Sequence, residues 1–287
     1  MKVLFLSKGD CPDYMRDMVY HGLMSTKGIQ VEELNPCNYM HDTFAAQKGG
    51  LYGKGFTVFA RLSSETQPQT VISVDEMLRK VADKYYDYII YGSIHRYQEY
   101  LEHISLIYDL SKILIIDGED HPSVDYKLAR FGTYFKRELQ DDSSYSTTRP
   151  ISFAIPKELI ISQVPTKVKY DAHIIAGDRN TYIFDKEEEY FADYQHSVFG
   201  HTKQKGGWDC CRHYEILMNG CIPYFESLEK CPFRTMMTFP KSTILRTNDI
   251  YKRGKKMESA EYEFWINSLL SYTRLHNTTE ALISQLI

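Results

Sequence analysis

The chain has 287 residues, enough for two domains or for one large domain with a sizeable core. A charged fraction of 25% is ordinary for a globular protein, and a net charge of -4 argues against nucleic-acid binding over the whole surface. A local basic patch is still present, because residues 196–256 carry eleven lysines and arginines against five acidic residues.

The six cysteines, at positions 11, 37, 210, 211, 221 and 231, lack the spacing of a disulfide framework or a zinc site. We expect free thiols in a reducing compartment. The opening MKVLFLS is too short an apolar run for a signal peptide, and no stretch approaches the roughly 18 apolar residues of a transmembrane helix. The sequence therefore predicts a soluble cytoplasmic protein.

Strands and helices alternate in the first half of the chain. The predicted strands are 2–7, 29–34, 88–91 and 112–116. Three helices are predicted in this half. One ends near residue 24, one spans 73–84 with Ser73 as its cap, and one ends near residue 110. This succession is typical of a parallel α/β sheet, in which ligands gather at the carboxyl ends of the strands.

Polar residues follow two of these strands. His95 comes after the strand 88–91, and the acidic run 117–121 comes after the strand 112–116. Three carboxylates beside a histidine suit a metal site, a general base or only a solvated loop. The glycine-rich stretch 47–62 either lets a ligand approach the backbone or forms a surface loop.

A polar stretch over 140–149, followed by Pro150, is the clearest change in composition and predicts the linker between two domains. The second half of the chain also alternates between predicted strands and predicted helices. Its predicted strands are 170–176, 221–225 and 242–245, and its predicted helices begin at 187 and span 259–276 and 278–286. We expect the acidic face of the helix that begins at 187 to be solvated.

The stretch 196–241 opens as a loop rich in glycine and lysine and continues as a helix that ends at Gly220, with Asp209 as the expected N-cap. Backbone N–H groups and the positive end of the helix dipole would face whatever lies in front of the loop. Such an arrangement suits a phosphate group. Arg179, which follows the strand 170–176, is placed to meet the same ligand.

The segment GGWDCCRHYEILMNGCIPYF, residues 206–225, resembles the donor-binding half of GT-B glycosyltransferases, and exostosin-like and related bacterial and viral members in particular. The segments IDGEDH, YFKREL and LYGKGFT resemble parts of the amino-terminal halves of such enzymes, but only 206–225 is specific. The resemblance implies an α/β fold with two Rossmann-like α/β/α domains facing across a cleft. The implied parts are an acceptor-side domain at 1–150, a nucleotide-sugar-binding domain at 151–265, and terminal helices at 266–287 that pack back on the first domain.

The resemblance also implies roles for single residues. Glu215 would accept hydrogen bonds from the ribose of a nucleotide sugar, while arginine and lysine side chains would meet its diphosphate. The residues expected to bind the donor are Glu215, Arg212, Lys205, Lys203, Gly207, Asp209 and Arg179. The alternative for Arg212 and Glu215 is a surface ion pair one helical turn apart, worth only a few tenths of a kcal/mol.

One position departs from the family pattern. Retaining members often carry a second glutamate with seven residues between the two, and that position here is Gly207. The stereochemical outcome is therefore open. If the reaction inverts, a base from the first domain should deprotonate the acceptor, with Asp120, His95 and Asp10 as candidates in that order. Because no D-x-D run follows a strand, we expect no obligatory metal or other cofactor, with the nucleotide sugar as co-substrate.

Four functions remain open. The leading hypothesis is transfer of a sugar from a nucleotide donor, expected to be UDP-linked, to a hydroxyl of a glycan or small molecule. A second makes the acceptor a hydroxymethylated cytosine in DNA, as in phage enzymes; the compact length and residue usage fit a viral origin, which would place the protein in the host cytoplasm. The third is a nucleotide-sugar epimerase of the same architecture, and the fourth is a module that binds a nucleotide without chemistry.

Overall fold

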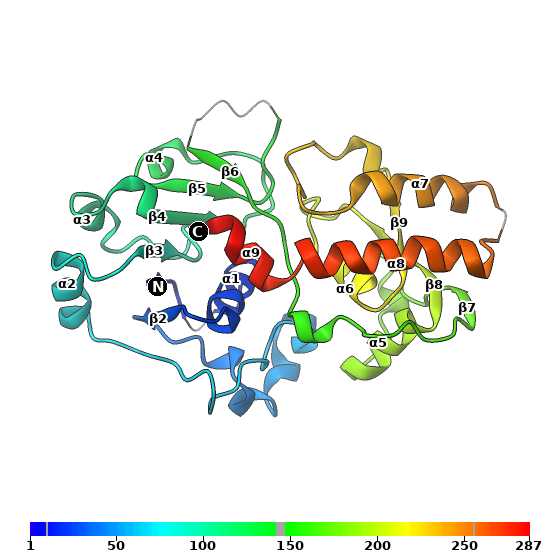
Figure 1. Cartoon of the computed structure of the whole chain (residues 1–287), viewed down its shortest axis with the longest axis horizontal. Coiled ribbons are helices and arrows are strands. Elements are labelled where there is room, and N and C mark those ends of the chain that lie inside the picture. Colours follow the sequence, from blue (N-terminus) through cyan, green and yellow to red (C-terminus); the bar gives the residue numbers. More distant parts are fainter. Residues whose placement is uncertain (10, 142–146, 255) are drawn as a thin grey trace.

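The computed structural model describes residues 1–9, 11–141, 147–254 and 256–287. They form two lobes that lie side by side (Figure 1), and each lobe is built on a parallel sheet. Residues 2–150 supply the first sheet and residues 169–226 the second. This is the two-domain α/β architecture expected from the sequence, whereas the domain limits given above stay predictions.

The first sheet is parallel throughout and has the strand order β2-β1-β3-β4-β5-β6. Its strands are β1 (Lys2–Leu6), β2 (Gln30–Glu33), β3 (Tyr88–Tyr91), β4 (Ile113–Asp117), β5 (Thr133–Lys136) and β6 (Thr148–Pro150). The four strands expected in this half are confirmed. β1, β3 and β4 are nearly all buried, which explains why they appear in the sequence as apolar runs. The order reverses between β1 and β3, which is where open α/β sheets form a ligand crevice.

The second sheet is also parallel, with the order β7-β8-β9, and its strands are β7 (Lys169–Asp171), β8 (Ser197–Lys203) and β9 (Ile222–Glu226). Two expectations are wrong here. The strand predicted at 170–176 ends at Asp171, because the backbone of His173 donates to the Asp193 carboxylate (2.8 Å) instead of a neighbouring strand. The first part of the expected glycine and lysine loop is the strand β8, whose mixed residues give no clear alternation.

Nine α-helices complete the described part of the chain. They are α1 (Tyr14–Ser25), α2 (Val74–Ala82), α3 (Leu101–Ser105), α4 (Tyr126–Ala129), α5 (Glu187–Gln195), α6 (Cys211–Met218), α7 (Lys241–Lys252), α8 (Ser259–His276) and α9 (Thr279–Leu286). Ser73 caps α2 as expected, accepting from the Glu76 N–H at 3.2 Å. The strand predicted at 242–245 is wrong: these residues begin α7, which Asn248 ties to β9 through the Phe225 carbonyl (2.7 Å).

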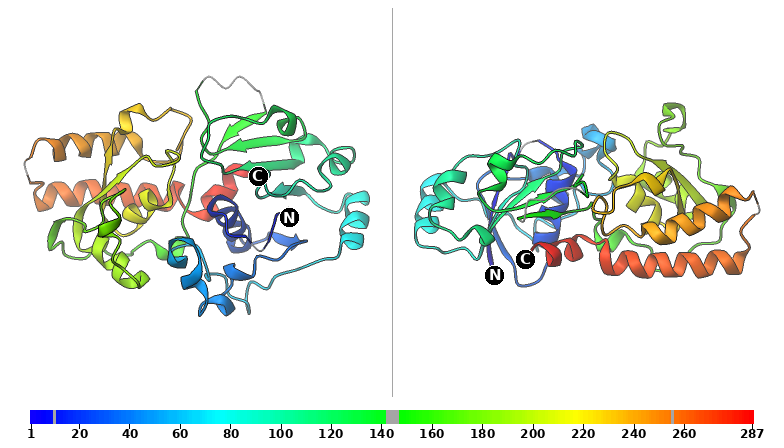
Figure 2. Two further views of the ribbon diagram at one scale, coloured as in Figure 1. Left: turned by 180° about the vertical axis from the view of Figure 1, so that it is seen from behind. Right: turned by 90° about the horizontal axis from the view of Figure 1, so that it is seen from above.

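The carboxyl-terminal helices connect the two lobes. α8 runs along the C-terminal lobe and leads into α9, which lies beside α1 on the N-terminal lobe (Figures 1 and 2). His21 Nδ1 of α1 is 2.9 Å from the Thr279 hydroxyl, and Gly22 lets the backbone of α9 approach closely. The end of the chain therefore stabilises the relative position of the lobes.

All six cysteines are free thiols, as predicted. No helix in the described ranges is both long enough and apolar enough to cross a membrane.

Replacing Gly22 by alanine tests the contact between α1 and α9. A Cβ there would lie 2.3 Å from the Thr279 carbonyl oxygen, so α9 would have to move. Overpacking of this kind costs about 1–3 kcal/mol, against a gain of about 1 kcal/mol in helix propensity. Because the close approach is to backbone, which cannot rotate away, we expect the upper part of this cost and a net decrease of about 1–2 kcal/mol in the free energy of unfolding in urea. Gly49→Ala, whose Cβ would meet nothing within 4 Å, is the control; a Gly22→Ala protein as stable as wild type would contradict the contact.

Candidate functional site

A cavity of about 860 Å³ lies between the two lobes. The N-terminal lobe lines it with Tyr14, Asp120 and Arg137, and the C-terminal lobe lines it with Arg212 and Glu215 of α6, among others. The helix singled out from the sequence therefore faces the loops that follow the strands of the first sheet.

The start of α6 differs from the expectation. Its N-cap is Cys210, so the capping role expected for Asp209 is wrong. The Asp209 carboxyl instead accepts from the Phe153 N–H (2.7 Å) and from the Tyr214 hydroxyl (2.9 Å). Burial raises the pKa of Asp209 to about 7. Asp209 lines the cavity, but both of its carboxyl oxygens already accept hydrogen bonds from the protein. A direct contact between Asp209 and a nucleotide sugar stays a prediction.

Glu215 is buried at the cavity wall with 7% of its surface exposed. The Thr57 hydroxyl donates to Oε1, and the Tyr190 hydroxyl donates to Oε2 at 2.5 Å. The surface ion pair considered for Arg212 and Glu215 is not formed, since Glu215 bonds these hydroxyls instead. The carboxylate is thus bound by one hydroxyl from each lobe.

Arg212 lines the same cavity and has hydrogen-bond donors without a partner. Its Nε and Nη1 atoms are buried and have no partner in the described part of the chain. The guanidinium carbon lies 5.0 Å from the centre of the Tyr182 ring, a cation–π contact. Buried N–H donors without acceptors cost free energy unless a ligand accepts from them. Arg212 is therefore suited to bind an anion.

Two further cations from the predicted set reach this cavity and one does not. Lys205 Nζ is 3.3 Å from the Tyr182 hydroxyl, and exposed Arg179 lines the cavity. Lys203, at the end of β8, packs against Gly177 and is not among the described residues that line the cavity. Arg212, Lys205 and Arg179 thus form a positive wall.

The glycines before α6 let the loop pass close to the N-terminal lobe. A Cβ on Gly206 would lie 2.3 Å from Asp120 Oδ2, and one on Gly207 would lie 2.4 Å from Glu138 Oε1. Glu138 also accepts from the Trp208 N–H at 2.9 Å. The space that a side chain at position 207 would need is therefore occupied by a carboxylate of the other lobe.

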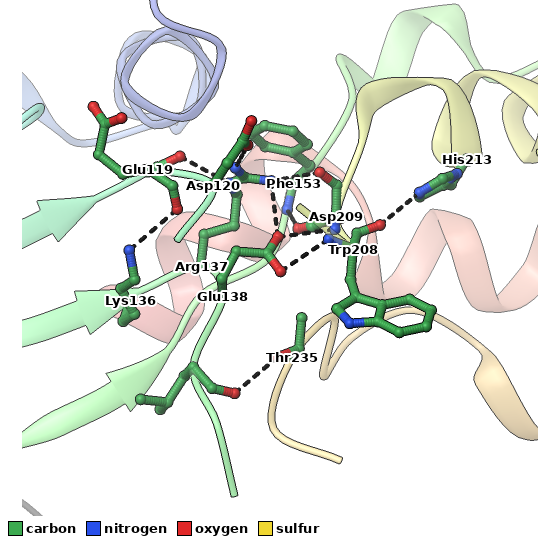
Figure 3. A network of polar contacts seen from close by, with 12 residues as sticks. Glu119, Asp120, Lys136, Arg137, Glu138, Phe153, Trp208, Asp209, His213 and Thr235 are labelled. Carbon is green, nitrogen blue, oxygen red and sulfur yellow. Dashed lines mark hydrogen bonds and ion pairs between the residues drawn. The ribbon is translucent and has the colours of Figure 1, made fainter. Parts of the chain in front are cut away.

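Arg137 connects this loop to the first sheet (Figure 3). Its side chain is 2% exposed, and its Nε donates to the Gly118 carbonyl at 2.9 Å. The other nitrogens donate to Glu138, to the Asp209 carbonyl and to Asp120. One buried guanidinium thus fixes the end of β4, the end of β5 and the start of α6 relative to one another.

The three candidate bases have different positions. Asp120 has a side chain that is 64% exposed and lines both the large cavity and an adjoining cavity of about 290 Å³. His95 Nε2 lies 3.2 Å from Asp117 Oδ2, and that hydrogen bond raises the pKa of His95. His95 is not among the described residues that line either cavity. Asp10 lies outside the described residues.

Several residues of the site were not predicted from the sequence, and Glu187 is the clearest. It was expected on a solvated face, but it is 7% exposed and accepts from the Thr57 N–H (2.6 Å) and from Lys48 Nζ (3.0 Å). Nothing near Glu187 in the sequence marks this contact. Arg137 and Glu138 did carry a usable signal, since they directly follow the strand β5, whose two central residues are aromatic.

In the described part of the chain, no three His, Cys, Asp or Glu side chains are grouped so that they could hold a metal ion. The polar groups that line the large cavity are mainly cations and hydroxyls, which are donors suited to an anionic organic ligand.

Comparisons with known proteins give likenesses in three-dimensional structure. No family model matches the chain, and no curated protein matches its sequence. The chain is similar to MurG of Acinetobacter baumannii, with 8% identity, a TM-score of 0.45 and coverage of 99% of this chain and 98% of that one. It is also similar to Anabaena HepE in complex with UDP-glucose (9% identity, TM-score 0.48, coverage of 100% and 98%) and with UDP and glucose (10% identity, TM-score 0.49, coverage of 99% and 98%). The two parallel α/β lobes facing across a cavity are themselves the GT-B arrangement expected from the sequence.

His213 lies behind the site and is fully buried. Its ring nitrogens are each 2.8 Å from an oxygen, one of the Thr202 hydroxyl and one of the Trp208 carbonyl. Burial lowers the pKa of His213 to about 3. The ring therefore stays neutral near neutral pH and holds the loop before α6 by hydrogen bonds.

The pH dependence of stability tests this role. An unfolded histidine protonates near pH 6.5, so between pH 6.5 and about 3 the unfolded chain binds a proton that the folded chain does not. The free energy of unfolding should then fall by about 1.4 kcal/mol per pH unit on acidification, or about 2 kcal/mol at pH 5. In urea titrations at pH 8 and pH 5, His213→Gln should lose that part of the decrease. The exposed residue His276 supplies the control, His276→Gln; parallel profiles for wild type and His213→Gln would contradict the assignment.

Proposed function

We propose that this chain is a glycosyltransferase that moves a sugar from a UDP-linked donor to a hydroxyl acceptor. The observation that carries the proposal is Arg212, which lines the cavity together with the Glu215 carboxylate and whose buried Nε and Nη1 atoms have no hydrogen-bond partner among the described residues. An anion site beside a carboxylate matches the two polar parts of a nucleotide sugar, its diphosphate and its ribose.

The diphosphate lies against Arg212, Lys205 and Arg179 in this proposal, near the positive end of α6. The departing nucleoside diphosphate gains negative charge in the transition state, and fixed cations stabilise that charge best where water is excluded. These three side chains supply the positive charge, so we propose that no metal ion is obligatory. The choice of UDP keeps the expectation that accompanied the resemblance of residues 206–225 to the donor-binding half of GT-B glycosyltransferases.

Asp120 is the proposed base of an inverting displacement. Arg137 holds Oδ1, while Oδ2 lies against the loop at Gly206, and Asp120 lines both cavities. Oδ2 takes the proton of the acceptor hydroxyl while the oxygen of that hydroxyl forms a bond to the anomeric carbon of the sugar. The bond from that carbon to the diphosphate breaks at the same time, and the diphosphate leaves with the electron pair.

The smaller cavity supports a neutral acceptor over DNA. Its charged side chains are largely paired, since Asp13 lies 3.4 Å from Arg96 and Asp120 bonds Arg137. Glu119 is left as a carboxylate with no ion-pair partner among the described residues. Phosphate groups of DNA are bound by unpaired lysine and arginine, so a net negative cavity disfavours them. We therefore propose a hydroxyl of a glycan or small molecule as the acceptor.

A donor and acceptor panel tests the proposal. The protein is incubated with UDP-glucose, UDP-galactose and UDP-N-acetylglucosamine, each alone, with neutral sugars and with hydroxymethylated DNA. Release of UDP that requires a neutral hydroxyl acceptor supports the proposal. Release only with DNA would select a DNA glycosyltransferase, interconversion of free UDP-sugars an epimerase, and binding without turnover a module that only holds the nucleotide.

Replacing Glu215 by glutamine tests its contact with ribose. Hydrogen bonds to a carboxylate are worth about 1.5–3 kcal/mol, so the loss of charge should weaken UDP binding about tenfold or more. Binding of 2′-deoxy-UDP, which lacks one ribose hydroxyl, should weaken less, and the preference for UDP should shrink. Isothermal titration calorimetry measures both affinities. Glu226→Gln, at an exposed position at the end of β9, is the control; an unchanged preference for UDP in Glu215→Gln would remove the ribose contact.

Replacing Asp120 by asparagine tests the base. Removing a general base typically lowers turnover by 10²–10⁴-fold. We expect Asp120→Asn to lower kcat by about that factor and to change UDP affinity little, because the carboxylate acts on the acceptor. Glu119→Gln changes the neighbouring carboxylate of the same loop and should keep most of kcat. Equal kcat for wild type and Asp120→Asn would return the role to His95 or Asp10.

A further inference from the structure

Residues 48–61 of the N-terminal lobe, which we name the strap, reach across the large cavity to the C-terminal lobe. Tyr52, Gly53, Lys54 and Phe56 of the strap line the cavity. The Phe56 ring stacks on Tyr190 of α5 with centroids 5.6 Å apart. The strap is therefore part of the wall next to the proposed donor.

Glu187, at the start of α5, anchors the strap. It accepts from Lys48 Nζ at 3.0 Å, from the Thr57 N–H at 2.6 Å and from Arg61. A second anchor joins Lys54 Nζ to the Asp185 carboxylate at 2.6 Å. Because Glu187 is 7% exposed, its own contacts are shielded from water and salt, whereas the pair of Lys54 and Asp185 is exposed.

The backbone of the strap is strained. Lys54, Thr57 and Ala60 have φ angles of 57°, 71° and 57°, in the left-handed region. This region is a genuine outlier for a β-branched residue such as threonine, and such conformations persist only where surrounding contacts impose them. At Thr57 these contacts are the Glu187 and Glu215 carboxylates of the other lobe, together with two bonds inside the strap, from the Val58 N–H to the Phe56 carbonyl (2.9 Å) and from Arg61 Nε to the Thr57 carbonyl (3.1 Å). The two carboxylates are the part of this strained state that comes from outside the strap.

Glu215 has too few free lone pairs for both the strap and a ribose. A carboxylate offers about four lone-pair sites. Thr57, Tyr190 and, at 3.5 Å, the Cys211 thiol already donate to Glu215, and the residue is 7% exposed. Two ribose hydroxyls need two sites. One of the present donors must leave. The Cys211 thiol is the weaker donor, but Thr57 is the one that belongs to the other lobe and whose left-handed backbone can relax when it leaves.

We propose that the strap is an internal competitor of the donor: the Thr57 hydroxyl occupies the Glu215 oxygen that a ribose hydroxyl takes when a nucleotide enters. Donor binding then displaces Thr57, relieves the left-handed backbone at that residue and loosens the strap from α5. This inference rests on the proposed function in assigning the ribose to Glu215.

The first experiment measures UDP affinity by calorimetry. Thr57→Val keeps the size and branching of the side chain but lacks the hydroxyl, so UDP no longer competes with it. We expect about tenfold tighter UDP binding, while Thr57→Ser, which keeps a hydroxyl, binds like wild type. Thr43→Val, at an exposed position outside the strap, is the control. UDP binding by Thr57→Val that is equal to or weaker than wild type overturns the competition.

The second experiment measures amide hydrogen exchange in peptides that span residues 51–61, with no nucleotide present. Glu187→Gln removes the charge that holds the strap and should speed exchange at these amides about tenfold, whereas Glu188→Gln, at an exposed position on the same helix, should not. Unchanged exchange in Glu187→Gln overturns the strap. Addition of UDP to wild type should also speed exchange at these amides, and slower exchange overturns the displacement.

The two readouts separate the strap from the proposed function. If wild type binds none of UDP, GDP and ADP, the proposed function fails and the competition fails with it. If wild type binds UDP and Thr57→Val binds it no more tightly, the strap fails while the proposed function stands.

Discussion

A buried guanidinium, that of Arg137, determines how the two lobes meet. A charge removed from water is tolerated only when paired and hydrogen-bonded, and losing one partner typically costs about 3–5 kcal/mol. Arg137 meets this demand with Glu138 and Asp120 of its own lobe and with the Asp209 carbonyl of the other. The loop before α6 therefore cannot move without unpairing a buried charge. The positions of Arg212 and Glu215 follow from that loop.

The two lobes exchange carboxylate contacts in both directions. Glu138 of the N-terminal lobe accepts from the backbone at Trp208, and Glu215 of the C-terminal lobe accepts from Thr57. In the first contact, Glu138 accepts from a backbone N–H and also pairs with the buried Arg137, so this contact is a fixed part of the interface. The second is to a strained threonine at a cavity wall, so it can open at lower cost. This difference makes Glu138 structural and leaves Glu215 available for a ligand.

The sequence predicted most of the elements in which one face or both faces are apolar. The strands β1, β3 and β4 and the helix α8 are examples, because local periodicity determines them. It missed β8 and the start of α7, where burial depends on neighbours distant in the chain. The same limit applies to the site. The contact of Glu138 with Trp208 spans 70 residues, and that of Thr57 with Glu215 spans 158, so no local pattern encodes either.

Arg212 is the part of the site that folding alone does not explain. Its Nε and Nη1 atoms are buried without acceptors, which costs about 1–3 kcal/mol, and the cation–π contact with Tyr182 returns about 0.5–2 kcal/mol. The carboxylate one turn along the helix, Glu215, could have paired with it but bonds Thr57 and Tyr190 instead. A chain selected only for stability would place an acceptor beside the guanidinium. Keeping the cation unpaired in a cavity, next to a carboxylate held apart from it, is the arrangement expected where an anionic ligand completes the hydrogen bonding.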